Sequence, residues 1–175
     1  MKTFTLLISL VVLNLKSYSQ LPTDYPFKTH LDNFNNLHVT GFKSDNYHTE
    51  KHTFDGDNIW RITIPNIGFD RGYGVVADVA GNSYTAGFIF NSASKSNDIC
   101  IVKYSSSNGN IVFIKILESP FDDKAFCIDI DNVGNMYVAG YITNHSGNKD
   151  IITVKYDYNG NLLWSFTYDN PTYKK

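Results

Sequence analysis

The sequence lacks a strong excess of charge, a long apolar run and a glycine-rich phosphate-binding loop. Lys and Arg total 15 against 17 Asp and Glu, so the formal net charge is −2 and no basic field exists to attract nucleic acid or an anionic membrane surface. The longest apolar stretch, Phe4 to Leu13, has about half of the roughly 20 residues that a bilayer crossing needs. We therefore expect no nucleic-acid partner, no membrane-spanning segment and no Rossmann or P-loop site.

The residues that are abundant favour β-structure. Tyr, Phe, Ile, Val and Thr outnumber Ala, Leu and Glu, and aromatic residues make up 15% of the sequence. The length, less an N-terminal leader, suits one domain with a core of its own. The composition therefore predicts a single all-β domain.

The N-terminus has the pattern of a secretory signal peptide. Lys2 supplies positive charge before the apolar stretch, and Ser17-Tyr18-Ser19 offers small residues at the positions that guide cleavage. We predict cleavage after Ser19, which makes residues 1–19 the signal peptide and residues 20–175 the mature protein. No cysteine lies near this point for lipid attachment, so we expect a protein that is secreted or held at the cell surface.

Three copies of one repeat follow the leader. Each copy contains two blocks that align with those of the other copies, and the matching glycines are 46 and 53 residues apart. The matching positions are Asp32, Asp78 and Asp131; Gly41, Gly87 and Gly140; Lys51, Lys103 and Lys155; and Trp60, Phe113 and Trp164. The glycine suits a close approach of backbones, and the aromatic residue suits a wedge between neighbouring copies.

Turn residues divide each copy into four strands. In the last copy the predicted strands are 126–131, 135–141, 150–157 and 161–168. The turn between the third and fourth strands holds Asp55-Gly56, Asn108-Gly109 or Asn159-Gly160, pairs that predict a type I′ hairpin. Each copy is therefore expected to be an up-and-down antiparallel meander.

Such meanders are expected to pack side by side around an axis. A four-stranded unit with two apolar faces cannot cover itself, and radial repetition solves this. We predict three blades of a partial, open β-propeller, at about residues 27–64, 73–117 and 126–168. Closed propellers have about 4 to 8 blades, so three leave a face exposed at each end. His48 and Glu50 replace apolar residues in the first copy and predict a polar cap there.

Two explanations of the open arc remain. The preferred one is a truncated or naturally shortened member of a longer propeller architecture, because the tail DNPTYKK resembles the segment LESPFDDKA that precedes the third repeat. The other is self-association of two chains, which would close a six-bladed ring.

The Asp, Gly-Asn and Tyr pattern of the second and third copies resembles the bacterial SBBP (seven-bladed β-propeller) repeat family. The residues that carry the resemblance are DVAGNSYTAG and DNVGNMYVAG, followed by DICIVKY and DIITVKY, whereas Asn35 and His38 depart from it in the first copy. The resemblance implies an exported or surface protein and supplies no catalytic motif. A rival interpretation is a quinoprotein-type propeller, because the segment from Asp157 to Trp164 is similar to its tryptophan-docking motif.

The two cysteines are expected to stay free. Cys100 aligns with Ile152, so a small thiol would fill the place of a buried aliphatic residue. An exported protein would still permit a bridge from Cys100 to Cys127.

Four of the five histidines fall in the first copy, which raises the possibility of a metal site: His30, His38, His48 and His52. His48 and His52 lie on one strand roughly 13 Å apart, which is too far for both to bind one ion. We expect surface histidines, no metal and no cofactor.

Charged residues in the loops between blades are the candidate ligand-binding surface. These loops and those joining strands two and three emerge on one face of the array, where variable chemistry belongs. The candidates nearest a central mouth are Asp70, Arg71, Asp122, Asp123 and Lys124. The turn aspartates are expected instead to bind backbone amides: Asp32, Asp78, Asp131 and Asp157.

No arrangement typical of hydrolysis is present, neither a nucleophile with a base nor two carboxylates set across a cleft. The sequence therefore favours a non-enzymatic exported binding or scaffold module with a protein or glycan partner. The alternative is a remnant or subunit of a propeller enzyme that acts on glycans.

Overall fold

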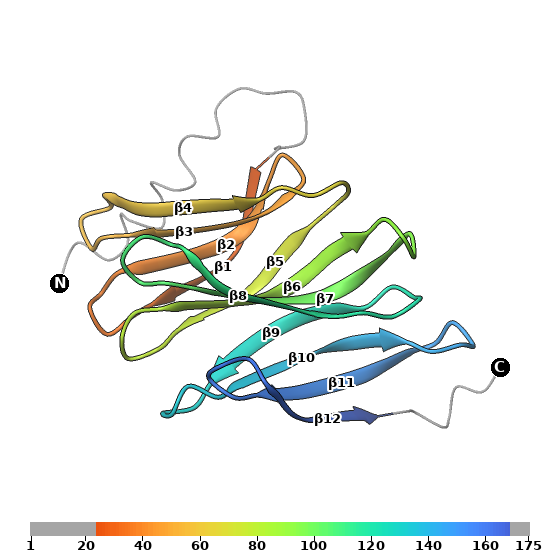
Figure 1. Cartoon of the computed structure of the whole chain (residues 1–175). Coiled ribbons are helices and arrows are strands. Elements are labelled where there is room, and N and C mark those ends of the chain that lie inside the picture. The colour runs from red at the N-terminus through yellow and green to blue at the C-terminus, as the bar shows by residue number, and fades with distance from the viewer. Residues whose placement is uncertain (1–23, 169–175) are drawn as a thin grey trace.

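The computed structural model describes residues 24–168, which form twelve strands and no helix (Figure 1). The strands make three four-stranded antiparallel sheets in which consecutive strands pair. This confirms the predicted all-β class and the division into three four-stranded repeats. Because these residues form only strands and turns, none belongs to an apolar helix long enough to cross a bilayer. The predicted signal peptide and the tail DNPTYKK lie outside the described residues.

The strand bounds follow the repeat. The first sheet contains β1 (Asp24–Leu31), β2 (Leu37–Lys43), β3 (Asn46–His52) and β4 (Asn58–Ile64). The second contains β5 (Arg71–Ala77), β6 (Ser83–Asn91), β7 (Ser96–Tyr104) and β8 (Ile111–Leu117). The third contains β9 (Lys124–Ile130), β10 (Met136–Thr143), β11 (Lys149–Tyr156) and β12 (Leu162–Tyr168). Each sheet begins two or three residues before the predicted start, because its first strand continues on the N-terminal side of a β-bulge.

The hairpin turns correct the type I′ prediction. Type I′ needs positive φ at both central residues, but in Asn159-Gly160 and its counterparts only the glycine has it, with φ of 92° at Gly56, 72° at Gly109 and 80° at Gly160. Type I′ character occurs instead at Ser44-Asp45, where φ is 48° and 66°. The glycine turns are closed by side chains as well as by the glycine. In the last copy Asp157 Oδ1 accepts the N–H groups of Asn159 and Asn161 at 2.9 and 2.8 Å, and in the first copy Thr53 Oγ1 accepts the N–H of Asp57 at 3.1 Å.

The predicted role of the turn aspartates is confirmed. Asp32, Asp78 and Asp131 each accept two backbone N–H groups of their own turn in the same way. Asn35 has a φ of 61° at the position that Gly81 and Gly134 occupy with φ of 77° and 84°. An asparagine therefore fills the glycine position in the first repeat, since Asn tolerates the left-handed region better than most residues.

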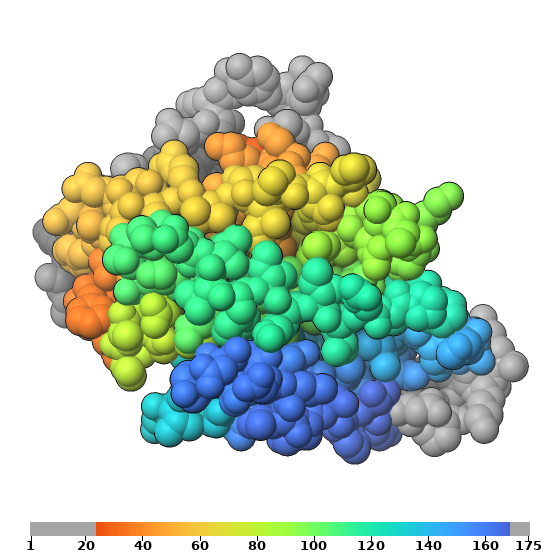
Figure 2. Space-filling view, in the orientation of Figure 1, coloured from red at the N-terminus to blue at the C-terminus, as the bar shows by residue number. Residues whose placement is uncertain are grey.

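The second sheet lies between the first and the third. Figure 2 shows this layering on one face of the molecule, with the outer strands β4 in yellow, β8 in green and β12 in blue. The first strands β1, β5 and β9 lie side by side on the inner side of the array. Two apolar clusters fill the two interfaces. The sheets thus stack through their faces, as the repeat predicts.

The interface residues confirm two predictions about packing. Cys100 is buried, with 1% of its surface exposed, in a cluster with Val102, Tyr104, Tyr47 and Trp60, and both cysteines are free thiols. Trp60 is 5% exposed, and its indole N–H donates to the Ser106 carbonyl of the next sheet at 3.2 Å. Cys100 therefore replaces an aliphatic residue, and Trp60 is a wedge between sheets.

Candidate functional site

The predicted loop residues do meet at one end of the sheets. The N–H of Asp70 donates to the Asp45 carbonyl at 2.8 Å, and the N–H of Asp123 donates to the Asn97 carbonyl at 2.7 Å. Each segment that links two sheets therefore contacts the hairpin between the second and third strands of the preceding sheet. The structure brings the candidates together in two groups, one at each junction between sheets.

Asp70 and Asp123 are buried, and each one anchors a loop. Each is 1% exposed, and their carboxylates accept the N–H groups of Phe90 at 2.7 Å and Thr143 at 2.8 Å. Burial raises the pKa of both carboxyl groups, against the lowering effect of these hydrogen bonds. Asp24 holds Ser44 in the same manner at 3.2 Å. The same contact thus recurs in all three sheets, and in each sheet the aspartate holds the backbone near the end of the second strand.

Arg71 and Lys124 occupy matching surface positions, each over an aromatic ring of the preceding sheet. The Arg71 guanidinium lies 3.6 Å from the ring centre of Phe42, and the Lys124 ammonium lies 4.2 Å from that of Phe88. Arg71 also forms an ion pair with Asp45 at 3.1 Å. Burial lowers the pKa of Lys124. These are cation–π contacts that join neighbouring sheets.

Asp122 is the exposed member of the predicted set. Its Oδ1 accepts the backbone N–H of Asn97 at 2.9 Å and the side-chain N–H of the same residue at 2.8 Å. It thus ties the second junction together from the solvent side.

A row of aromatic residues lies beside these cations and was missed by the sequence analysis. Phe27, Tyr73 and Phe126 are the extra residues of the β-bulges in β1, β5 and β9. Their ring centres are 4.7 Å apart from Phe27 to Tyr73 and 5.4 Å apart from Tyr73 to Phe126. Phe27 is 40% exposed and Phe126 is 48% exposed. We call these three residues the aromatic row.

A second set of rings supports the row from beneath. Phe42, Phe88 and Tyr141 on the second strands lie 5.8, 5.7 and 5.7 Å from Phe27, Tyr73 and Phe126 respectively. Phe42 and Phe88 are the rings that carry Arg71 and Lys124, and Lys149 lies 4.1 Å from the centre of Tyr141. Each sheet thus presents one ring on a bulge, one supporting ring and one nearby cation.

The repeated glycines make room for the bulges that carry the row. A Cβ at Gly41, Gly87 or Gly140 would lie 2.0, 1.9 or 2.0 Å from a carbonyl oxygen of the adjacent first strand. Only glycine permits this approach. The close backbone contact predicted from the repeat is therefore confirmed, and it fixes the bulge that turns the aromatic residue outward.

A signal for the row is present in the sequence. Phe27, Tyr73 and Phe126 are separated by the same 46 and 53 residues as the glycines. A bulge shifts side chains relative to the alternation of a regular strand, so a period-2 pattern gives these positions no distinct direction. The repeat spacing, rather than the alternation, identifies them.

A shallow hollow of about 440 Å³ lies at the opposite end of the sheets, among the aspartate turns. Its lining includes His30, Asp78, Lys103, Asp129, Asp131 and Tyr158. Asp78 is fully engaged, because its oxygens accept N–H groups of Ala80 and Asn82 and the hydroxyl of Tyr84. Asp131 is engaged in the same way by Val133, Asn135 and Tyr137. These two carboxylates therefore offer little free hydrogen-bonding capacity to the hollow.

The histidines of the first sheet make separate contacts, and the expectation of surface histidines is wrong for His38, which is fully buried at the interface with the second sheet. His38 Nε2 and Lys51 Nζ both lie 3.1 Å from Asp32 Oδ2, and His38 Nδ1 contacts Ser83 of the second sheet. His52 and His48 lie on either side of Glu50, with nitrogen–oxygen distances of 3.3 and 3.7 Å. Among residues 24–168 no group of three metal-ligating side chains is placed to hold an ion.

Comparison with known proteins gives no assignment. No model of a protein family matches the chain, and no curated protein matches it either. The resemblance to SBBP repeats stays a prediction from the residues that carry it.

Proposed function

We propose that the chain is an exported, non-enzymatic binding module whose three sheets are successive blades of an open β-propeller, and that it binds a glycan along the aromatic row. The stacked sheets and the side-by-side inner strands support the propeller part of this proposal. The observation that carries the binding part is the recurrence of Phe27, Tyr73 and Phe126 as bulge residues whose rings form one row. The two outer rings are exposed and the central Tyr73 is half-buried.

The chemistry of the row suits a polysaccharide. The C–H face of a sugar ring packs on an aromatic face, and Tyr and cationic side chains nearby can bind hydroxyl or carboxylate groups. One ring and one cation per sheet form a repeating surface, and a polysaccharide is a repeating ligand. Because the row is held by bulges on paired strands, its geometry is fixed before binding, which limits the entropy lost.

Two observations support a non-enzymatic role. Asp70 and Asp123 are two of the candidate residues predicted from the sequence, and both are buried. In each, one carboxylate oxygen accepts a backbone N–H group. The aromatic row itself carries no carboxylate, and burial raises the pKa of its one titratable group, the Tyr73 phenol. Binding without turnover is therefore the function that these residues suit best.

Titration calorimetry with two soluble polysaccharides, one neutral and one carrying uronic acids, tests this proposal. Tyr73→Ala and Phe126→Ala should each weaken binding at least about fivefold, since stacking on one ring is worth about 1 kcal/mol or more. Tyr73→Phe keeps the ring and should bind nearly as well as the wild type. Lys124→Gln should weaken only the acidic polymer, and added salt should have the same effect.

Matched controls separate the row from exposed aromatic residues in general. Phe54→Ala removes a ring that is 65% exposed in the turn between β3 and β4, and it should leave the affinity unchanged. Absence of binding to either polymer would remove the glycan assignment. Release of new reducing ends, lost on Asp122→Asn, would favour the alternative of a glycan-acting enzyme.

A further inference from the structure

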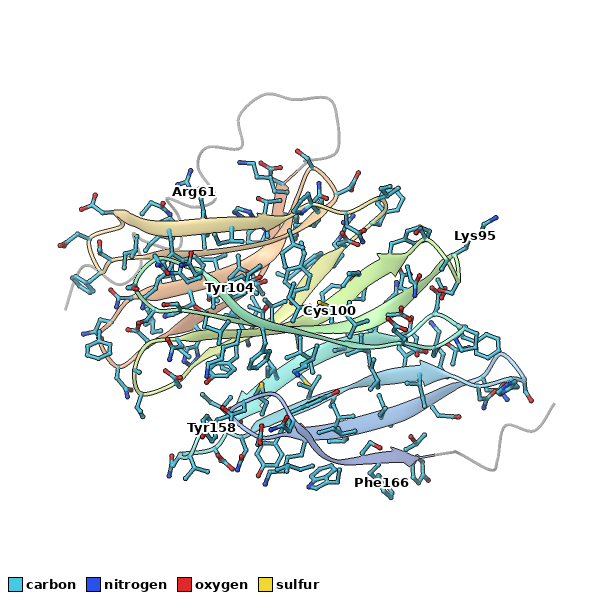
Figure 3. All side chains as sticks on the ribbon, viewed as in Figure 1. Arg61, Lys95, Cys100, Tyr104, Tyr158 and Phe166 are labelled. Carbon is cyan, nitrogen blue, oxygen red and sulfur yellow. The ribbon has the colours of Figure 1, made fainter. Side chains whose placement is uncertain are left out.

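The third sheet has one face that no other described residue covers. Residues paired directly across strands share a face, so Trp164 lies beside Lys155, Phe166 beside Thr153 and Tyr168 beside Ile151. The four large apolar side chains are 43% to 63% exposed: Trp164, Phe166, Tyr168 and Ile151. In Figure 3 Phe166 lies on the side of the third sheet that points away from the other two. We call this surface the open face.

The corresponding face of the first sheet shows how such a face is covered. Lys51 Nζ donates to the Gly81 carbonyl at 2.9 Å, and Trp60 Nε1 donates to the Ser106 carbonyl at 3.2 Å. Both carbonyls belong to turns of the second sheet. The Trp60 ring also stacks on Tyr104 at a centroid distance of 5.6 Å.

The second sheet repeats the arrangement toward the third. Lys103 Nζ donates to the Tyr158 carbonyl at 3.2 Å, in the turn that corresponds to that of Ser106. Phe113 replaces Trp60, and its ring lies 3.3 Å from where a Cβ on Gly160 would be. Each interface therefore joins a lysine and an aromatic ring on one sheet to turn backbone on the next.

The open face carries the same two groups in the same register. Lys155 pairs with Trp164 as Lys51 pairs with Trp60 and Lys103 with Phe113. Within residues 24–168 Lys155 lies over the Tyr137 ring at 4.7 Å, and Trp164 meets the edge of that ring at 6.3 Å. Neither reaches a turn carbonyl there. The donors of a third interface are thus present without their acceptors.

The face that covers these donors is apolar in both internal interfaces. The third strand of the second sheet supplies Cys100, Val102 and Tyr104, and that of the third sheet supplies Ile152, Val154 and Tyr156, all of them buried. A partner for the open face needs the same kind of third strand, together with turn carbonyls for Lys155 and Trp164.

The free face of the first sheet does not meet this need. His48, Glu50 and His52 stand at those positions, which bears out the prediction that polar residues replace apolar ones there. Glu50 lies 3.9 Å from Arg61 Nε as well as near both histidines, and contact with His48 foremost lowers the pKa of Glu50 to about 2. Burying this charged group against Trp164 and Phe166 would cost free energy. A second copy is therefore a poor occupant.

We propose that the open face is a docking site for a further four-stranded β-sheet of the same repeat type, supplied by another polypeptide and presenting an apolar third strand. The internal interfaces define its chemistry, and the interface that it forms continues theirs. The polar residues of the first sheet make the array directional, because only one of its two end faces accepts such a sheet.

A variant of the chain itself can serve as the occupant. The cap variant replaces His48→Ile, Glu50→Val and His52→Tyr, the residues found at these positions in the third sheet. Light scattering after size-exclusion chromatography should give a monomer mass for the wild type and a mass of two or more chains for the cap variant. Adding Ile151→Lys and Phe166→Lys to the cap variant should restore the monomer mass. If the triple substitution does not fold, Glu50→Val alone provides the same comparison.

Tryptophan fluorescence gives an independent measurement. The chain has two tryptophans, so Trp60→Phe leaves Trp164 as the sole reporter. This protein is mixed with a cap variant in which both tryptophans are replaced by phenylalanine. Because the cap variant should cover the open face, the emission of Trp164 should shift to shorter wavelength. A folded cap variant that stays monomeric, or one that associates despite the two lysines on the open face, would contradict the proposal. A wild type that associates and is dispersed by those lysines would make a second copy the occupant instead.

Discussion

At the scale of single residues, the contact that His38 makes between the first and second sheets depends on whether its imidazole is protonated. The side chain is fully buried between Asp32 and Ser83. Burial lowers the pKa of His38, and this outweighs the opposing effect of Asp32. In the unfolded chain the imidazole takes up a proton near pH 6.5. As the pH falls through that value, the unfolded state gains a proton that the folded state resists, so stability is lost.

His38→Gln should remove this pH dependence. Between pH 7.5 and 5.5 the free energy of unfolding of the wild type should fall by up to about 1.4 kcal/mol per pH unit more than that of the variant. Urea denaturation at several pH values measures the difference. His145→Gln, in the exposed turn between β10 and β11, is the matched control and should keep the wild-type slope. Equal slopes for His38→Gln and the wild type would show that His38 does not titrate on unfolding.

At the scale of structural elements, the turn between β2 and β3 holds two non-glycine residues in the left-handed region. Ser44 and Asp45 have φ of 48° and 66°, and Asp45 pairs with Arg71 across the junction. Ser44 is exposed, so its side chain gains little from this conformation while its Cβ adds strain. The hairpin therefore stores a small amount of backbone strain at Ser44.

Ser44→Gly should raise the free energy of unfolding by about 0.5 kcal/mol. Relief of left-handed strain is worth roughly 1 kcal/mol, and the greater freedom of glycine in the unfolded chain offsets part of it. Ser92→Gly is the control, because Ser92 is also exposed in a loop between the second and third strands but has no positive φ. Ser92→Gly should lower the free energy of unfolding by about 0.5 kcal/mol, because only the unfolded chain gains freedom. Thermal or urea unfolding of both variants measures the two changes, and a loss of stability in Ser44→Gly would contradict the prediction.

The sequence predicts the strands well because the three aligned copies give three residues for each structural position. Alternation and turn residues place the four strands of the last copy to within two residues at each end, and the matching of Cys100 with Ile152 predicts its burial. The turn type was wrong because a dipeptide such as Asn159-Gly160 does not reveal the Asp157 carboxylate that holds two amides of the turn. Loop length and side-chain capping, not the glycine alone, decide that geometry.

The candidate site was predicted only in part. The loops that carry Arg71 and Lys124 do meet, and both side chains lie beside the aromatic row. Asp70 and Asp123 look identical to binding residues in the sequence, because their backbone partners lie about 20 residues away and depend on the sheet being formed. Tyr73 escaped notice because a bulge reverses the direction that alternation would assign. The anchoring role of these aspartates and the place of Tyr73 both depend on contacts beyond the local pattern.

At the scale of the whole molecule, the two interfaces between sheets differ in chemistry. The interface between the second and third sheets is mainly aliphatic, with Val138, Ile152 and Val154 against Ile99 and Ile101. The first interface includes polar groups that reach across it, among them His38 and Lys51. Each outer sheet contacts only the middle one to a substantial extent. Stability should therefore behave as a sum of neighbouring interfaces.

Val102→Ala and Val154→Ala test this nearest-neighbour behaviour at equivalent positions. Val102 packs toward the first sheet and Val154 toward the second, and both are almost completely buried. Each substitution should lower the free energy of unfolding by about 2 kcal/mol. Hydrogen exchange read by mass spectrometry should show where the loss is felt: Val154→Ala should speed exchange in β9–β12 while β1–β4 stay protected, and Val102→Ala should do the reverse. Equal acceleration in all twelve strands would mean that the three sheets unfold as one unit, so that covering the open face would stabilise the distant first sheet as much as the third.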